Sequence, residues 1–376
     1  MNVVLTFTHK TSLKVWEESG LLSREISFYK KLSEKYGINF TFITYGNEYD
    51  LKFNEYFTNL KIYPLYKYVK ESKFEILNYL KCFSFINKIK SEITTTDLIK
   101  TNQLTGGWLG LILKFKLNKP LIVRTGFDKL SFHIKEKRSM FSIFIIYIFT
   151  QICISFSDVY FVTSETDRNF LTKYLIGSNK IKVRPNWVYV NKEHSIDSRK
   201  ENILMVGRLE DQKNYAYVFE SLKDSKFIID IYGSGSKKKE LENLAFKNNL
   251  NVNFFGNVEN KDLLNIYSKY KYLLISSKFE GNSKVILEGM GSGCIVFASN
   301  IPNNSEIIAN QVNGYLFDFN DDLKSTISNV QNQSEIHDSI SKNALKTVID
   351  KYSIDKIIKE EYKTWLAKGN TPEASD

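Results

Sequence analysis

The chain of 376 residues has few of the side chains that usually bind transition metals or form disulfides. Its three cysteines, Cys82, Cys153 and Cys294, are far apart, and each lies next to apolar residues. Its four histidines show no close spacing. This pattern fits neither a zinc site nor a disulfide framework, so we expect buried free thiols in a reducing compartment.

Two further features are missing from the sequence. The amino terminus, Met1–Phe7, lacks the basic start and the small-residue cleavage site of a signal peptide, and it reads as a first buried strand. The net charge is +10, but no recognisable nucleic-acid-binding module accompanies it. We therefore expect a cytoplasmic protein that binds no nucleic acid.

Charged residues are absent from Ser139 to Ser157, and the centre of this run is Phe144–Phe149. Its length is close to that of a membrane span. Serine, threonine and glutamine residues dilute it, however, and the strand-like segment Val159–Thr163 follows at once. We expect a buried or membrane-facing helix inside an α/β domain.

Positive charge is concentrated between Lys61 and Lys90, where seven lysines occur with two acidic residues and several interleaved aromatic residues. A basic and aromatic surface suits an anionic bilayer. A solvated helix face whose aromatic rings turn to the core explains the same pattern. Both interpretations remain open at this point.

Hydrophobic residues make up 43% of the chain, which is ample for packed cores. Most strand candidates are continuous apolar runs, as expected when helices cover both faces of a parallel sheet. Helical patterns, for instance Ser23–Tyr36, Lys238–Lys247 and Lys261–Lys269, fall between them. In chain order the strand candidates are Val3–Phe7, Phe40–Thr44, Leu121–Val123, Val159–Thr163, Ile203–Val206, Phe227–Tyr232, Val252–Phe255, Tyr272–Ser276, Ile295–Ala298 and Tyr315–Phe317.

Alternation of strands and helices in two series predicts an α/β fold of two doubly wound domains. A polar stretch, Asn186–Asn202, follows Pro185 and separates the two series. We assign residues 1–190 to the first domain and residues 191–350 to the second. Residues 351–376 form a C-terminal helix, which could cross back to the first domain, and a frayed tail from Gly369.

The most informative motif follows the apolar run Tyr272–Ile275. Glu280 and Gly281 lie in the turn after this strand, and Glu288 lies on the helix that follows. The two acids are eight positions apart, and at about 100° per residue they do not share one helix face. We expect one carboxylate in the loop and one on the helix, both directed at a ligand over the carboxyl end of the strand.

A second motif begins the second domain, where Ile203–Val206 is followed by Gly207, Arg208 and Lys213. A glycine at the strand end lets the backbone approach a ligand closely. The planar fork of Arg208 suits phosphate, and Lys213 adds a point charge near it. Free amides at the start of the next helix favour an anion. A diphosphate is the expected ligand.

The glycine turn Gly233–Gly235 follows a later strand and is a weak signal by itself. It fits a nucleotide site or a tight strand-to-helix turn equally well.

The order of these elements resembles the retaining glycosyltransferases of family four, the glycosyl transferases group 1, of bacterial surface-polysaccharide type. The resemblance is dense from Ile203 to Phe317 and thinner before it. It implies the GT-B architecture of two facing Rossmann-like domains. The motifs that carry it are Gly207-Arg208 with Lys213, the Gly233–Gly235 turn, Gly256-Asn257-Val258, and Glu280-Gly281 with Glu288.

The resemblance implies a role for each charged residue. Arg208 and Lys213 would hold the diphosphate of a nucleotide sugar. Glu288 would accept hydrogen bonds from the ribose hydroxyls. Glu280 would bind hydroxyls of the donor sugar near the reacting carbon and is the implied catalytic residue.

Backbone groups complete the implied donor site. Gly20 would approach the phosphates from the first domain, Gly207 would let the strand end approach them, and Gly256 and Val258 would read the base. Amides at a helix start would contact the sugar; they belong to Gly281, Asn282, Ser283 and Lys284.

The chain contains no D-x-D sequence, so we expect no metal and no cofactor besides the nucleotide-diphosphate sugar substrate. Cleavage of the sugar–phosphate bond builds negative charge on the leaving diphosphate and positive charge on the anomeric carbon. Fixed cations beside the first and a carboxylate near the second provide the required electrostatic stabilisation.

Three departures from the family pattern lead to further expectations. Ser283 occupies a place near the helix start where the family often has proline, and we expect it to cap the helix. Gly289 and Gly291 replace favoured alanines, which suggests a shortened helix or a close approach of backbone to ligand. A histidine that many relatives carry after the strand Leu121–Val123 is missing; Arg124 or Asp128 could meet the donor or acceptor instead.

We therefore predict a glycosyltransferase that moves a sugar to a saccharide or lipid-linked saccharide acceptor in cell-surface polysaccharide synthesis. An anionic membrane surface on the cytoplasmic side is a further expected partner. Two alternatives keep the fold: a sugar-nucleotide epimerase and a non-catalytic partner subunit. Retention of Arg208, Lys213, Glu280 and Glu288 argues against the non-catalytic alternative.

Overall fold

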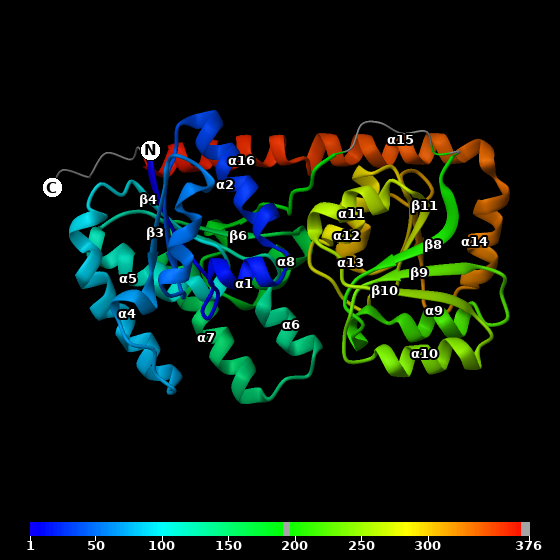
Figure 1. Ribbon diagram of the computed structural model, residues 1–376, viewed down its shortest axis with the longest axis horizontal. Helices are drawn as coiled ribbons and strands as arrows, with labels where there is room; N and C mark the ends of the chain where they lie inside the picture. Colours follow the sequence, from blue (N-terminus) through cyan, green and yellow to red (C-terminus); the bar gives the residue numbers. More distant parts are fainter. Residues whose placement is uncertain (191–195, 197, 370–376) are drawn as a thin grey trace. The chain divides into compact units, whose positions relative to one another are not determined.

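The computed structural model describes residues 1–190, 196 and 198–369, which form two compact units (Figure 1). The first unit comprises Met1–Arg184 and the segment from Ile358 onward, and the second comprises Pro185–Ile357. The division falls at Arg184, whereas the predicted boundary lies between residues 190 and 191, next to residues outside the described part. The predicted frayed tail beyond Gly369 also lies outside the described residues.

The first unit is built on a parallel sheet. Within the described residues it has seven strands in the order β3-β2-β1-β4-β5-β6-β7, and each neighbouring pair is parallel. The strands are β1 (Asn2–Thr6), β2 (Asn39–Thr44), β3 (Leu60–Pro64), β4 (Leu98–Thr101), β5 (Leu121–Arg124), β6 (Val159–Val162) and β7 (Ile181–Val183).

Helices cover both faces of this sheet. Since the chain moves in one direction across the sheet from β4 to β6, α5 and α7 cover the same face, and one apolar core joins α4 to them through Phe85, Leu113 and Cys153. The helices of this unit are α1 (Leu13–Glu18), α2 (Leu22–Tyr36), α3 (Leu65–Tyr68), α4 (Glu75–Ile89), α5 (Gly107–Leu117), α6 (Lys129–Lys135), α7 (Met140–Phe156) and α8 (Glu165–Tyr174). Short 3₁₀ helices are η1 (Glu48–Tyr56), η2 (Lys90–Glu92), η3 (Leu104–Gly106) and η4 (Ser178–Lys180).

The C-terminal helix α16 (Ile354–Gly369) packs on the opposite face of the first sheet together with α2. Tyr36 stacks on Tyr362 with ring centroids 3.9 Å apart, and the ring of Phe40 meets that of Trp365 at 6.1 Å. Trp365 is fully buried. From Ile358 onward this helix is therefore an integral part of the first unit.

The second unit has a parallel sheet of six strands within the described residues, in the order β10-β9-β8-β11-β12-β13. Every residue of β11 and β12 is buried, which explains why these strands are apolar in the sequence apart from Lys271 and Ser299. The strands are β8 (Lys200–Val206), β9 (Ile228–Tyr232), β10 (Asn251–Gly256), β11 (Tyr270–Ile275), β12 (Ile295–Ser299) and β13 (Tyr315–Phe317). The helices are η5 (Asp211–Lys213), α9 (Tyr215–Ser221), α10 (Lys238–Lys247), α11 (Asn260–Tyr267), α12 (Lys284–Gly291), α13 (Pro302–Ser305), α14 (Leu323–Asn332) and α15 (Ser334–Lys351).

The strand order of the second unit reverses at β8. The chain adds β9 and β10 on one side of β8 and then crosses over to add β11, β12 and β13 on the other. The connections after β8 and β11 therefore lead to opposite faces of the sheet. At such a point, open parallel sheets bind ligands at the carboxyl edge. The predicted α/β fold of two doubly wound domains is confirmed, and the loop motifs predicted to bind the donor follow these two strands.

Candidate active site

Two glycines bring the first two loops of the second unit into backbone contact. Gly207 follows β8 with φ +152°, and its N–H donates a hydrogen bond to the Tyr232 carbonyl (3.0 Å). Gly233 follows β9 with φ +147°, and a Cβ atom at this position would lie 1.9 Å from the Gly207 carbonyl oxygen. No side chain fits at 233 without moving the loop after β8.

The loop after β10 joins the same rim. The N–H of Gly233 donates to the Gly256 carbonyl (2.8 Å), and the N–H of Leu209 donates to the Ser234 carbonyl (2.9 Å). The loops after β8, β9 and β10 are thus held together by backbone hydrogen bonds. The Gly233–Gly235 turn, left open by its sequence, has a definite packing role in this rim.

An ion pair joins the loops after β8 and β11. Lys213 Nζ lies 2.5 Å from Glu280 Oε1, and the side chains are 15% and 9% exposed. The hydroxyl of Ser277 donates to the same carboxylate oxygen (2.6 Å). Hydrogen bonds between charged groups are short and strong in such poorly solvated surroundings. The structure therefore brings together the predicted diphosphate cation and the predicted sugar-binding carboxylate.

Backbone contacts fix this pair in place. The N–H of Lys278 donates to the Gln212 carbonyl (2.9 Å), and the Gln212 side chain donates to the Phe279 carbonyl (2.9 Å). The hydroxyl of Ser276 donates to the Lys213 carbonyl (2.8 Å). The two loops are fastened on both sides of the ion pair, so its position does not depend on the ion pair alone.

Arg208 extends the positive charge toward solvent. It is exposed, and its Nη2 donates to the Gln212 side-chain oxygen (3.2 Å). A guanidinium has five N–H donors, so this single bond leaves donors for a phosphate. Gln212 links the arginine to the loop that carries Glu280.

A buried phenol supports the loop after β8 from below. Tyr215 begins α9, and its hydroxyl donates to the Gly207 carbonyl (3.1 Å). Burial raises the pKa of Tyr215, and the nearby charge of Glu280 raises it further. The phenol therefore stays protonated and remains a donor at neutral pH.

Glu288 has a hydrogen-bond partner of its own. It lies on α12, is 7% exposed, and accepts a hydrogen bond from the hydroxyl of the fully buried Tyr267 (3.2 Å). The structure thus pairs Glu280 with Lys213 and connects Glu288 to the last residue of α11. The two acids do not share one helix face, as their spacing predicted.

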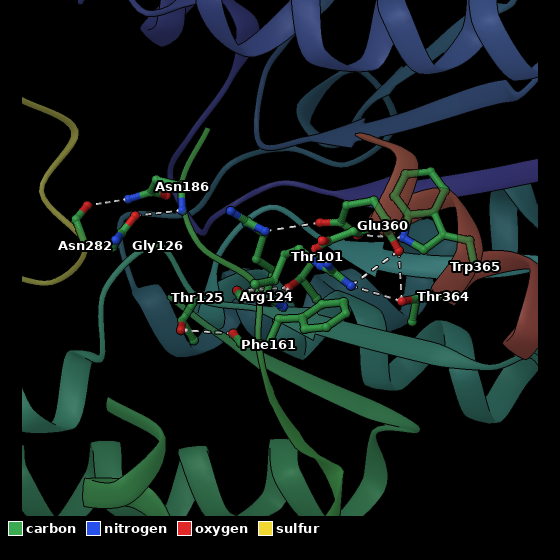
Figure 2. Close-up of polar contacts among 12 residues, drawn as sticks. Thr101, Arg124, Thr125, Gly126, Phe161, Asn186, Asn282, Glu360, Thr364 and Trp365 are labelled. Carbon is green, nitrogen blue, oxygen red and sulfur yellow. Dashed lines mark hydrogen bonds and ion pairs between the residues drawn. The ribbon is translucent and has the colours of Figure 1, made fainter. Parts of the chain in front are cut away.

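The start of α12 differs from one expectation. Ser283 is the N-cap residue, but its side chain makes no capping hydrogen bond among the described residues, so the predicted cap is wrong. The preceding residues, Gly281 and Asn282, are buried, and Asn282 is fixed by Asn186: the Asn186 N–H donates to its side-chain oxygen (2.8 Å), and the Asn186 side chain donates to its carbonyl (2.7 Å; Figure 2). The Lys284 ammonium lies 5.5 Å from the ring centroid of Trp187. Tertiary contacts replace the capping hydrogen bond here.

The two glycines at the end of α12 have packing roles. The helix ends at Gly291, and a Cβ atom on Gly289 would lie 2.2 Å from a methyl group of Leu273 in β11. The sequence suggested a shortened helix or a close approach of the backbone to a ligand. The helix is short, and the backbone at Gly289 closely approaches the neighbouring strand β11.

The residues predicted to read the base lie at the outer edge of the sheet. Gly256 has φ +76°, and a Cβ atom there would meet nothing within 4 Å. Val258 is 36% exposed. The ring of Phe255, which is half exposed, stacks on Tyr232 with centroids 4.6 Å apart. An open, partly aromatic surface is therefore present beside these residues.

In the first unit, Gly20 ends the turn after α1. It has φ +69°, and its N–H donates to the Glu17 carbonyl (3.0 Å). Asp128 caps α6 by accepting the N–H of Ser131 (2.7 Å), and burial raises its pKa to about 7. Its Oδ2 atom thereby caps a helix, whereas the buried Oδ1 atom has no hydrogen-bond partner among the described residues.

The expectation that Arg124 could meet donor or acceptor is wrong. Its guanidinium is buried and lies 3.1 Å from the Glu361 carboxylate of α16. Figure 2 shows Arg124 near Trp365 of this helix, and the indole N–H of Trp365 donates to the same Glu361 carboxylate; the contacts to Glu360 and Thr364 are made by Arg184. The Arg124 side chain lies on the sheet face that α16 covers, where its guanidinium binds Glu361.

Several residues that the sequence analysis did not assign contribute to the site; besides Tyr215, Ser276 and Asn186, they include Gln212, Ser277 and Tyr267. Gln212 and Ser277 lie inside the quoted motifs, and their polar side chains were the available signal. Tyr267 had no signal, since a tyrosine at a helix end is ordinary. Within the described ranges 1–190, 196 and 198–369, no group of three histidine, cysteine, aspartate or glutamate residues could hold a metal ion.

Comparison with known proteins connects this geometry to a family. Residues 190–347 match the family described as "Glycosyl transferases group 1". The GtfA subunit of a UDP-N-acetylglucosamine–peptide N-acetylglucosaminyltransferase from Limosilactobacillus reuteri is 28% identical over 195 residues, which are 49% of this chain and 37% of that protein. A UDP-Gal:alpha-D-GlcNAc-diphosphoundecaprenol alpha-1,3-galactosyltransferase from Escherichia coli is 26% identical over 331 residues, covering 78% of this chain and 84% of that protein.

Solved structures share the fold. The crystal structure of Anabaena HepE in complex with UDP has a TM-score of 0.74 at 14% identity, and the match covers 98% of this chain and 100% of that one. The fold is therefore GT-B, with two Rossmann-like domains.

Proposed function

Residues 190–347 match the glycosyl transferases group 1 family, and from this match we propose that the chain is a retaining glycosyltransferase. It moves a sugar from a nucleotide-diphosphate donor to a saccharide or lipid-linked saccharide acceptor in the synthesis of a cell-surface polysaccharide. The name of the Escherichia coli relative, which specifies a diphosphoundecaprenol-linked acceptor, supports this choice of acceptor class.

The observation that carries the proposal is the ion pair between Lys213 and Glu280 at the carboxyl edge of the second sheet. Both partners lie on loops, and these loops follow the strands at which the sheet order reverses. A buried ion pair at a ligand-binding edge places one positive and one negative group where a diphosphate and a sugar adjoin. This is the charge distribution that a nucleotide sugar requires.

The cations act on the leaving group. In this proposal, the diphosphate replaces Glu280 as the partner of the Lys213 ammonium. It also accepts hydrogen bonds from the remaining donors of Arg208, which is exposed. Negative charge grows on the diphosphate as the sugar–phosphate bond breaks, so fixed cations stabilise the transition state more than the ground state. Because Gln212 and Ser276 hold the loop, little reorganisation is needed when the charge develops.

The carboxylates act on hydroxyls. Glu280, released from Lys213 by the arriving diphosphate, accepts hydrogen bonds from the donor sugar and lies near the reacting carbon. Glu288 accepts from the ribose hydroxyls, and Tyr267 orients its carboxylate. Gly256 and Val258, with the exposed face of Phe255, contact the base.

We propose that the reaction needs no metal, since Arg208 and Lys213 supply the positive charge on the diphosphate. Excess chelator would then leave turnover unchanged. Recovery of lost activity by added Mg²⁺ or Mn²⁺ would contradict this part of the proposal.

The test begins with binding. Thermal shifts against a panel of nucleoside diphosphates and their sugars identify the donor, because a ligand at a hundredfold excess over Kd raises stability by about 2.7 kcal/mol. Donor hydrolysis and transfer are then compared for wild type and Glu280→Gln, which should lose about 10²–10³-fold in kcat. Glu259→Gln, an exposed acid of the same unit, is the matched control and should behave as wild type.

Each alternative gives a distinct outcome. An epimerase would convert the donor to its sugar epimer without any acceptor. A non-catalytic partner subunit would show neither hydrolysis nor transfer. Either result would overturn the transferase proposal.

A further inference from the structure

The helices on one face of the first sheet carry many exposed apolar side chains. On α7 the exposed fractions are 79% for Met140, 74% for Phe141, 61% for Phe144 and 51% for Ile145. A water-facing helix normally carries polar residues on its outer side. The outer side of α7 has no charged residue, so this face is unlike an ordinary protein surface.

Helix α4 repeats the pattern. Ile76 is 75% exposed, Leu80 55% and Leu77 44%, and Phe74 just before the helix is 72% exposed. Because α4 and α7 share one core with the same sheet face, their outer sides point away from that sheet in a common direction. Figure 1 shows the two helices on one side of the first unit. Together these residues form an apolar surface, named here the α4–α7 surface.

A groove runs into this surface. Its volume is about 400 Å³, and it is lined by apolar and aromatic side chains of three helices. Leu130 and Ile134 come from α6, Ile143 and Tyr147 from α7, and Phe170 from α8. The apolar chain of a lipid has room to lie here.

Basic residues adjoin the apolar surface at one end. Lys135, Lys137 and Arg138 are exposed immediately before α7, where they outnumber the single acid Glu136, which pairs with Arg138 (2.8 Å). Lys70 and Lys73 are exposed shortly before α4, next to the exposed acids Glu71 and Glu75. In a parallel α/β unit the connecting helices run opposite to the strands, so α4 and α7 both begin at the carboxyl edge of the sheet. The basic segments therefore lie at the same end of the surface, next to its most exposed apolar residues.

We propose that the α4–α7 surface docks on a bilayer with anionic headgroups. The first turns of α4 and α7 enter the interfacial region, and the adjoining lysines and arginine meet the phosphates. A lipid surface accounts for both features at once, because apolar side chains beside exposed cations match acyl chains beside anionic headgroups. None of the helices that the structure describes could span a bilayer. The proposal is therefore stated for docking at the bilayer surface only.

Two sequence patterns suggested membrane contact, the uncharged run Ser139–Ser157 and the basic segment Lys61–Lys90, and the structure shows which of their side chains are exposed. Of the basic segment Lys61–Lys90, the rings of Tyr63 and Phe85 belong to the core, whereas Phe74 and Phe83 are exposed. Only part of that segment is therefore available to a membrane. The docking proposal does not depend on the proposed reaction, since it concerns a surface of the first unit alone.

The experiment is flotation of the full chain with vesicles of phosphatidylglycerol and phosphatidylethanolamine, compared with neutral phosphatidylcholine vesicles. Wild type should float with the anionic vesicles at low salt and be released at high salt. The double variant Phe141→Glu/Phe144→Glu should bind at least about 100-fold more weakly. Phe246→Glu, at an 89% exposed position on α10 of the second unit, is the matched control and should bind as wild type.

Charge is tested separately. Lys135→Gln/Lys137→Gln/Arg138→Gln should weaken partitioning by about 100-fold, because each basic residue near the surface contributes roughly a factor of five. The control Lys239→Gln/Lys247→Gln/Lys269→Gln removes the same charge from exposed positions of the second unit and should have a small effect.

Insertion has a spectroscopic readout. Brominated lipids should quench a tryptophan introduced as Phe144→Trp and leave one introduced as Phe246→Trp unquenched. Absence of wild-type flotation, or flotation unchanged in Phe141→Glu/Phe144→Glu, would overturn the proposal. It would also be overturned if that variant converted a dimer to a monomer without affecting vesicle binding, since the surface would then be an interface between copies. Circular dichroism and thermal unfolding of the double variant check that the chain remains folded, independently of the proposed reaction.

Discussion

Each unit contains a buried ion pair, and the two pairs differ in what supports them. In the first unit Arg124 of β5 meets Glu361 of α16 on a sheet face, and the indole N–H of Trp365 donates to the same carboxylate (2.8 Å). In the second unit Lys213 meets Glu280 between two loops at the carboxyl edge of the sheet. The first pair joins regular elements inside a packed layer. The second joins loops beside the exposed Arg208.

Both pairs join a basic side chain to a glutamate, but the difference in their surroundings makes the first a structural contact and the second a candidate binding site. A pair enclosed by a strand and a helix cannot exchange partners without unpacking that helix. A pair between loops can exchange one partner for a ligand while the backbone contacts of Gln212 and Ser276 keep the loops in place. Location in the fold, more than burial or charge, distinguishes the two.

The largest effect should come from breaking the structural pair. Glu361→Gln removes the carboxylate that pairs with the buried guanidinium of Arg124, which should cost about 3–5 kcal/mol in the free energy of unfolding of the first unit. Chemical denaturation measures this loss. Nucleoside diphosphate affinity should stay within about twofold, since the site in the second unit is untouched.

A compensating variant sharpens the result. Arg124→Met/Glu361→Leu removes both charges and should recover most of the stability. Glu335→Gln, an exposed acid on α15, is the control for loss of one negative charge. If Glu361→Gln instead abolished donor binding with little loss of stability, the structural assignment of this pair would be wrong.

The corresponding change in the second unit should act on binding. Lys213→Met removes a charged donor to the diphosphate, and isothermal titration should show an affinity about 10–100-fold lower for the nucleoside diphosphate. Lys278→Met, an exposed lysine of the facing loop, should bind normally. Equal affinities for Lys213→Met and wild type would place the diphosphate elsewhere.

A third prediction compares two glycines of the rim. Gly233→Ala puts a methyl group against the Gly207 carbonyl in a conformation that disfavours side chains, and it should cost about 1–3 kcal/mol of stability. Gly256→Ala meets open space and should cost less, about 1 kcal/mol, through its positive φ alone. Thermal unfolding ranks the two. The two losses would be similar if the loop after β8 moved to admit the methyl group, and that result would contradict the packing role of Gly233.

A separate effect concerns pH and the buried Lys100 of the first unit. Its ammonium has no hydrogen-bond partner among the described residues, and burial lowers its pKa to about 8 from the ordinary 10.5. Between these values the unfolded chain binds more protons, so stability should rise with pH from about 8 to 10.5. Lys100→Met should raise stability at pH 7 and flatten this rise. Denaturation at several pH values measures both, and an unchanged slope would contradict the assignment.

The sequence predicted most strands because buried parallel strands are continuous apolar runs. Three strands were not predicted, each for a local reason. β3 carries Lys61 within a basic segment, and β7 is a short strand with Lys182 at its centre. β4 has four residues and includes Lys100, whose side chain lies on the face covered by α16.

The site was predicted in its residue types but not in its contacts. Lys213 and Glu280 follow strands that are separated in the chain by β9 and β10 yet adjacent in the sheet. Their direct pairing depends on that strand order, which periodicity does not reveal. The expectations for Arg124 and Ser283 failed for the same reason, since α16 and Asn186 approach these positions from distant parts of the chain.

The most direct test is a crystal structure of the chain with a bound nucleoside diphosphate. The account predicts that phosphate oxygens accept hydrogen bonds from Arg208 and Lys213, and that Lys213 has moved away from Glu280, whose carboxylate faces the sugar side of the diphosphate. A diphosphate bound away from these residues, with the Lys213–Glu280 pair intact, would contradict it.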